Sequence, residues 1–185
     1  GAPTSSTDDN MMSYSLPSLM DGLSANISYV PHGAASSQYA STMDWAVAYT
    51  GVEGLTLGYA SGEDKTTKGS EADVSTYYVT YAYGPVTVAF AETEYDSENT
   101  TTTSDKDFTA YSVAYTVTDE ISVSYGQETI EEGTGEDVET RGISASYTAG
   151  GMTITAASQD IENSAGSTAA TEDRERWALS ASFAF

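Results

Sequence analysis

The feature that most constrains this chain is a two-residue alternation that recurs along nearly its whole length. Apolar and aromatic residues occupy every second position within residues 12–16, 23–29, 45–49, 55–59, 77–83, 86–90, 111–117, 121–125, 143–147, 152–156 and 177–185. This is the period of a β-strand with one apolar face. A helical period fits none of these runs, and β-branched and aromatic residues dominate them. The sequence therefore predicts an all-β protein with about eleven strands.

The connections between these runs alternate in kind. Tight turns are expected at Met20-Asp21-Gly22, Val52-Glu53-Gly54, Tyr83-Gly84-Pro85, Thr118-Asp119-Glu120 and Ala149-Gly150-Gly151. Four of the five contain glycine, which adopts the backbone conformations that hairpin turns need. Long acidic loops are expected near residues 31–42, 62–73, 94–106, 128–139 and 160–174. We therefore expect an antiparallel up-and-down sheet with every tight turn at one edge and every long loop at the other.

The second face of each run is small and mildly polar. It carries serine, threonine, alanine and glycine, for example Ser122, Ser144 and Ser180, and almost no charge at mid-strand. A soluble barrel places its large apolar residues inside and charged residues outside. The pattern here is the reverse, as in a transmembrane barrel with an apolar band toward lipid and a watery lumen. Tyrosine and phenylalanine near the strand ends would form the aromatic girdles. The alternative is a soluble or surface-layer acidic β-protein with a structural or adhesive role.

Charge divides along the chain in the same way. The sequence has 28 acidic residues against 6 Lys plus Arg, a formal net charge of −22. Residues 60–73, 92–107, 127–139 and 159–175 contain most of the acids, so the charge belongs mainly to the loop edge. Such a chain repels phosphate backbones, and we expect no nucleic-acid partner. The loops would attract cations and bind Ca²⁺ or Mg²⁺ only loosely, because no segment has the spacing of an ordered calcium loop.

Other classes of protein are disfavoured by what the sequence contains. Fourteen tyrosines argue against intrinsic disorder, and the absence of cysteine excludes disulfide frameworks and thiolate zinc sites. No apolar stretch is long enough for a transmembrane helix, and the first residues lack the features of a signal peptide. The single histidine, His32, lies in a predicted loop without a catalytic motif around it. We expect no enzyme activity and no cofactor.

An odd number of strands raises a question of completeness. A single-chain bacterial barrel closes with an even number of antiparallel strands. The last expected strand ends at the tight-turn edge, whereas the first begins at the loop edge. We interpret residues 1–185 as a single domain that forms the C-terminal part of a longer barrel, with residues 1–10 as the end of a long loop.

Two segments resemble the general bacterial porins of the Gram-negative outer membrane. Residues 10–29 read NMMSYSLPSLMDGLSANISY. They are similar to the porin segment after the third, constriction loop, roughly Asn-x-x-x-Tyr-x-Ser-Pro-x-Phe-x-Gly-Phe followed by a later Tyr. Leu16-Pro17-Ser18-Leu19 departs from the commoner Ser-Pro-x-Phe. The chain end, WALSASFAF at residues 177–185, is similar to the closing strand of outer-membrane barrels.

The resemblance implies a trimeric outer-membrane channel for passive diffusion of small hydrophilic solutes and ions, with lipid as its surroundings. These strands would then be 6 to 16 of a 16-stranded barrel, and an 18-stranded barrel fits equally well. Asp8 and Asp9 would belong to the end of the constriction loop. Phe185, Phe183 and Trp177 would form the signal that the barrel-assembly machinery reads.

Strand parity provides candidate residues of the pore lining. They are Arg174, Arg176, Ser180, Ser144, Ser122, Tyr78 and Thr80. The two arginines could instead pair with Glu172, Asp173 and Glu175 at the base of the last loop, while Arg141 has outward parity. The acidic loops predict a bias toward cations. Tyr78 is the one large aromatic residue at mid-strand inward parity, which favours a general pore over a solute-specific one.

Overall fold

The computed structural model describes residues 11–17, 20–31, 41–64, 71–98, 105–133, 135–164 and 173–184. These residues form an 11-stranded sheet in which each strand pairs with its sequence neighbours, always antiparallel. The strands are β1 (Met12–Ser15), β2 (Leu23–Val30), β3 (Thr42–Val52), β4 (Leu55–Asp64), β5 (Ala72–Tyr83), β6 (Val86–Ser97), β7 (Lys106–Thr116), β8 (Ile121–Glu132), β9 (Val138–Ala149), β10 (Met152–Glu162) and β11 (Arg174–Phe183). The predicted all-β, up-and-down architecture is confirmed.

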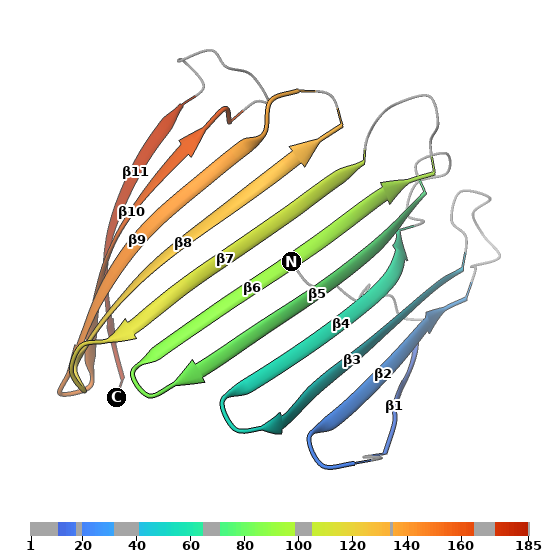
Figure 1. Cartoon of the computed structure of the whole chain (residues 1–185), viewed down its shortest axis with the longest axis horizontal. Coiled ribbons are helices and arrows are strands. Elements are labelled where there is room, and N and C mark those ends of the chain that lie inside the picture. The colour runs from blue at the N-terminus through green and yellow to red at the C-terminus, as the bar shows by residue number, and fades with distance from the viewer. Residues whose placement is uncertain are drawn as a thin grey trace.

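The sheet is a single curved layer (Figure 1). All five predicted tight turns lie along one edge, at the bottom of the view. They join β1 to β2, β3 to β4, β5 to β6, β7 to β8 and β9 to β10 into hairpins. The strands β1 and β11 form the two lateral edges and do not pair with each other, so the sheet is open. No helix in the described part of the chain has the length and hydrophobicity to cross a membrane. The architecture is that of a partial barrel.

Glycine shapes four of the tight turns. Gly22, Gly54, Gly84 and Gly150 have positive φ angles of 79°, 75°, 55° and 58°. L-residues with a Cβ adopt this region only with strain. The turn at Thr118–Glu120 has no glycine and is held differently. The Thr118 hydroxyl accepts hydrogen bonds from the backbone N–H groups of Glu120 and Ile121, at 3.2 and 3.1 Å. A side chain thus replaces glycine as the turn-forming element.

Several strands run further toward the loop edge than predicted. β4 continues to Asp64, β6 to Ser97 and β8 to Glu132, so these residues of the expected loops near 62–73, 94–106 and 128–139 are strand. The antiparallel ladder remains regular there, with Glu63 opposite Asp73 and Glu94 opposite Asp107. The prediction placed the loop starts too early because it followed the apolar alternation. Backbone hydrogen bonds continue where that alternation stops.

A single layer leaves this sheet with almost no buried core. Ala72, at 1% exposure, and Thr76, at 8%, are the buried non-glycine side chains of the described residues. Large apolar side chains are exposed instead, with Trp177 at 79%, Tyr83 at 76% and Leu179 at 68%. Contiguous exposed apolar surface of this extent requires an apolar environment or a partner. The fold by itself therefore favours lipid over water around one face.

Candidate functional site

The pairing register assigns every strand residue to one of two faces. Directly paired residues share a face, so the small face and the bulky face can be followed across all eleven strands. We call the face that carries Ser122, Ser144 and Ser180 the inner face. We call the face that carries Tyr125, Ile143 and Leu179 the outer face. The two names follow the polarity expected for a transmembrane barrel.

Hydroxyl groups pair across the inner face. Ser122 lies 2.7 Å from Ser146 and Ser124 lies 2.8 Å from Ser144, measured between the Oγ atoms. The predicted lining residues Ser180 and Thr80 also lie on this face, where Ser180 faces Thr155 and Thr80 faces Thr56 and Ala89. Small hydroxyls that satisfy one another leave room for water and carry no charge. The middle of the inner face is therefore a neutral, wettable wall.

Tyr78 is positioned by a glycine on the neighbouring strand. It lies directly opposite Gly58, and a Cβ built on Gly58 would collide with the Tyr78 ring. The ring therefore lies over the backbone of β4 rather than projecting into solvent. Tyr78 is 39% exposed. The pairing holds the ring against the wall. Its inward parity, predicted from the sequence, agrees with the register.

Charged residues of the inner face lie on β3, β7, β8 and β11. They include Asp44 on β3, Lys106 on β7, Glu128 and Glu132 on β8, and Arg174 and Arg176 on β11. Lys106 Nζ lies 2.6 Å from a carboxylate oxygen of Glu132, so this ion pair has no net charge. Within the described residues neither Arg174 nor Arg176 forms an ion pair, and Arg176 lies opposite Gln159. The predicted partners Asp173 and Glu175 do not bind them, and Glu172 lies outside the described residues.

Asp44 is an inner-face carboxylate that the sequence analysis did not single out. The Ser28 hydroxyl donates a hydrogen bond to Asp44 Oδ2, at 3.3 Å. The carboxylate leans over Gly62, where a Cβ would collide with Oδ1. Among the described residues no lysine or arginine forms an ion pair with it. Its only sequence signal is parity, because it precedes Trp45 and so shares the face of Ala46.

Above the mid-strand region the polarity of the two faces inverts. Near the loop edge the inner face carries bulky apolar residues, which are half-buried: Val74, Tyr95, Phe108, Ile130, Val138 and Ile161. At the same height acidic residues project from the outer face, including Glu94, Asp107 and Glu131. We call the six apolar residues the inner collar. This is the arrangement of a soluble barrel, so the strands continue beyond the apolar band into water.

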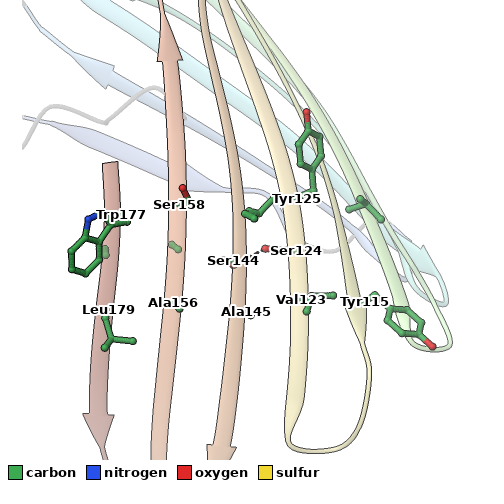
Figure 2. Close-up of a pocket in the computed structure, with 14 residues that line it drawn as sticks. Tyr115, Val123, Ser124, Tyr125, Ser144, Ala145, Ala156, Ser158, Trp177 and Leu179 are labelled. Carbon is green, nitrogen blue, oxygen red and sulfur yellow. Dashed lines mark hydrogen bonds between the residues drawn. The ribbon is translucent and has the colours of Figure 1, made fainter. Parts of the chain in front are cut away.

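The outer face carries an apolar band with a shallow groove of about 740 Å³. Its floor is formed by the small residues Ala145, Ala156 and Ser158 on β9 and β10. Larger side chains rise on both sides, Tyr115, Val123 and Tyr125 from β7 and β8, and Trp177 and Leu179 from β11 (Figure 2). A concave apolar surface between bulky walls has the shape and polarity that lipid chains fill.

A polar row closes the apolar band toward the loop edge. The Tyr111 and Tyr125 hydroxyls both donate to Gln127 Oε1, at 2.5 and 3.1 Å. Arg141 lies opposite Gln127 and forms ion pairs with Glu139, at 2.5 Å, and Glu162, at 3.3 Å. Its predicted outward parity above the band agrees with the register. Tyrosine hydroxyls beside charged groups are typical of the membrane–water interface.

Some predicted site residues cannot be placed. Asp8, Asp9 and Phe185 lie outside the described residues. Phe183 and Trp177 lie on the outer face of β11, where Phe183 faces Met152 and Trp177 faces Ser158. No group of three or more His, Cys, Asp or Glu side chains suited to a metal ion occurs in the described part of the chain.

The open sheet, the apolar outer band and the polar inner wall define the wall of an outer-membrane type of transmembrane barrel. A family model described as Gram-negative porin matches residues 1–139. The chain belongs to the Gram-negative porin family. Membership places it in the bacterial outer membrane. Among curated proteins, none shows significant sequence similarity.

Solved porin structures share the fold. A porin refined at 1.8 Å resolution superposes with a TM-score of 0.68 at 17% identity, covering 90% of this chain and 59% of that one. An anion-selective porin from Comamonas acidovorans gives 0.64 at 11% identity, covering 82% and 48%. OmpT of Vibrio cholerae gives 0.57 at 20% identity, covering 82% and 53%. The chain thus spans between about half and three fifths of the length of these structures. At these identities the likeness concerns the fold alone.

Proposed function

We propose that this chain forms the larger part of the wall of an outer-membrane diffusion channel for small hydrophilic solutes, with a preference for cations. The neutral hydroxyl wall supports passage of hydrated solutes without a strong specific site at mid-height. The apolar outer band supports residence in lipid, which a soluble or surface-layer protein would not need. A trimer and recognition of the β11 end by the assembly machinery are further proposals that rest on family membership.

One observation carries the proposed cation preference, the concentration of acidic residues at the loop edge. On the described strands the outer-face acids near that edge are Glu63, Asp73, Glu92, Glu94, Asp96, Asp107, Glu131, Glu139, Asp160, Glu162 and Glu175. Arg141 is the basic residue that faces them. A rim with one dominant sign of charge raises the local concentration of counter-ions at the pore mouth. It also attracts Ca²⁺ or Mg²⁺ diffusely.

The inner wall alone does not decide the selectivity. Asp44 and Glu128 are balanced in number by Arg174 and Arg176, and Lys106 is paired with Glu132. A preference that arises at the rim depends on a long-range field, which salt screens over about 10 Å at 0.1 M and about 3 Å at 1 M. The anion-selective relative shares only 11% identity, so its selectivity does not transfer to these charges.

Reversal potentials in planar bilayers test the proposal. With the purified protein in a KCl gradient, we expect stepwise conductance and a potential of the sign for K⁺ preference. The preference should be strong when the mean concentration is about 0.01–0.1 M and weak near 1 M, because screening removes the field of the rim. Anion preference at low salt would refute the rim argument. Absence of stepwise conductance would refute the channel itself.

A further inference from the structure

The inner face holds a small pocket at the β1–β4 end of the sheet, with a mainly apolar surface and several polar groups. Its volume is about 360 Å³ and its polar lining residues are Ser13, Ser15, Asn26, Ser28 and Asp44. All five lie on the inner face by register, with Ser13 opposite Ser28 and Ser15 opposite Asn26. The volume is at the lower end of the range for ligand sites, which suits a small solute.

The charge of this pocket comes from Asp44. No described lysine or arginine pairs with it, and Lys106, the nearest inner-face base along the sheet, is on β7. Four strand spacings separate β3 from β7, about 19 Å at ~4.8 Å per strand. Over that distance salt screens the base from the carboxylate. Among the described residues, no base therefore compensates the negative charge that the pocket presents to a solute in the lumen.

The position of the carboxylate depends on two neighbours. Ser28 donates to Oδ2, which orients the carboxylate plane. Gly62, opposite it on β4, leaves the space into which Oδ1 leans, since a Cβ there would collide with it. Gly62 has no positive φ angle, so the backbone does not require glycine at this position. The absence of a side chain at Gly62 leaves the space that the Asp44 carboxylate occupies.

These groups match the chemistry of a primary ammonium. Such a group offers three N–H donors, and a carboxylate, an amide oxygen and serine hydroxyls can accept them. Ala46 and Ala60 also line the pocket and offer apolar contact to a short hydrocarbon portion. A divalent metal ion prefers several carboxylates, and the described residues contain no such group.

We infer that this pocket is a binding subsite for small solutes that carry a primary ammonium group, with Asp44 as the charged acceptor and Gly62 as a positioning residue. The inference rests on the proposed channel function, which brings solutes to the inner face. It makes the proposed function more specific, because one class of permeating solute binds transiently to the channel wall.

Two small cations of similar size distinguish binding at a subsite from non-specific electrostatic attraction. n-Propylammonium has three N–H donors, whereas tetramethylammonium has the same charge and none. Each is added as its chloride to the purified protein in planar bilayers, and the concentration for half-maximal reduction of the K⁺ current is measured. Titration calorimetry of the detergent-solubilised protein with the same two salts reports binding without conduction.

For the unchanged protein we expect n-propylammonium to bind at least about fivefold more tightly than tetramethylammonium, since only the former forms charge-assisted hydrogen bonds. Asp44→Asn should weaken the binding of n-propylammonium by about tenfold or more. Gly62→Ala keeps the charge of Asp44 but displaces its carboxylate. We therefore expect the affinity for n-propylammonium to fall by about three- to tenfold. Asp160→Asn, which removes a charge from the outer face, should change binding by less than about twofold.

Gly142→Ala is the matched control for Gly62→Ala. Gly142 lies on the inner face of β9, and an added Cβ would meet its nearest atoms at 3.4 and 3.5 Å, which are ordinary contacts. Equal binding of the two probes, or an Asp44→Asn protein that binds as before, would overturn the subsite. An unchanged affinity in Gly62→Ala beside a loss in Asp44→Asn would also overturn it, in favour of a diffuse field. The protein could form no channels in bilayers and still bind n-propylammonium more tightly than tetramethylammonium in calorimetry, with the expected losses in Asp44→Asn and Gly62→Ala. That result would support the subsite and refute the channel function.

Discussion

Ala156 provides the sharpest test of which face meets lipid. On the outer face it belongs to a cross-strand row with Val123, Ala145 and Leu179. The polar row of Arg141 and Asp160 begins four residues further along β10, about 14 Å at ~3.4 Å per residue. The tight turn lies a similar distance away on the other side. Ala156 therefore lies near the middle of the apolar band, in the floor of the groove of Figure 2.

Replacing Ala156 with arginine should destabilise the folded protein by about 2–4 kcal/mol, the cost of a basic side chain near the mid-height of a lipid-facing surface. The guanidinium cannot bridge the ~14 Å to the polar row, so snorkelling lowers this cost only in part. Ala157→Arg is the matched control. Ala157 is the next residue on the same strand but faces inward between Ser144 and Ala178, and we expect a cost of about 0–1 kcal/mol there.

The assay is reversible denaturation by guanidinium chloride in lipid vesicles, followed by tryptophan fluorescence. Heat-modified gel mobility provides a second measure of the folded fraction. The reasoning requires Ala156→Arg to be less stable than Ala157→Arg by roughly 2 kcal/mol. If the two variants are equally stable, or if Ala157→Arg is the less stable one, the assignment of inner and outer faces is wrong.

Three further predictions concern the turn edge and the inner collar. Gly54→Ala should cost about 1–3 kcal/mol in the same denaturation assay, because φ is 75° and the new Cβ would collide with the Ala82 carbonyl oxygen. Thr118→Val should cost about 1 kcal/mol by loss of the hydroxyl acceptor, whereas Thr118→Ser should be nearly neutral; equal losses would contradict the turn assignment. Phe108→Ala should cost about 1–3 kcal/mol, less than for a fully buried phenylalanine, and an unchanged midpoint would show that the inner collar is not packed.

Much of the fold could be predicted because its signals are local. The alternation in 111–117 and 121–125 marks two strands, and the short polar interval between them marks a tight turn. The loop edge was harder to locate. At Glu94 and Glu131 the apolar alternation has stopped, yet the strands continue because the backbone ladder needs no apolar side chains.

The candidate site was predicted only in part. Parity placed Ser122, Ser144, Tyr78 and Thr80 on the face that the register confirms as common to them. Asp44 was not singled out because one acidic residue before Trp45 has no pattern of its own. Its significance depends on Ser28 and Gly62, each 16 or more residues away in sequence. Contacts between such distant residues depend on strand pairing, which no local signal specifies.

The sequence by itself determined the strand class, the two chemically different faces and the separation of an acidic loop edge from a glycine-rich turn edge. Each of these depends on the spacing of residues within a few positions of one another. Only the tertiary structure decided which residues meet across strands, such as Tyr78 over Gly58, Asp44 over Gly62 and Arg141 with Glu162. It also located the height at which the faces exchange polarity, at the inner collar. Register decides both, because a shift of one residue would turn every side chain of a strand to the opposite face.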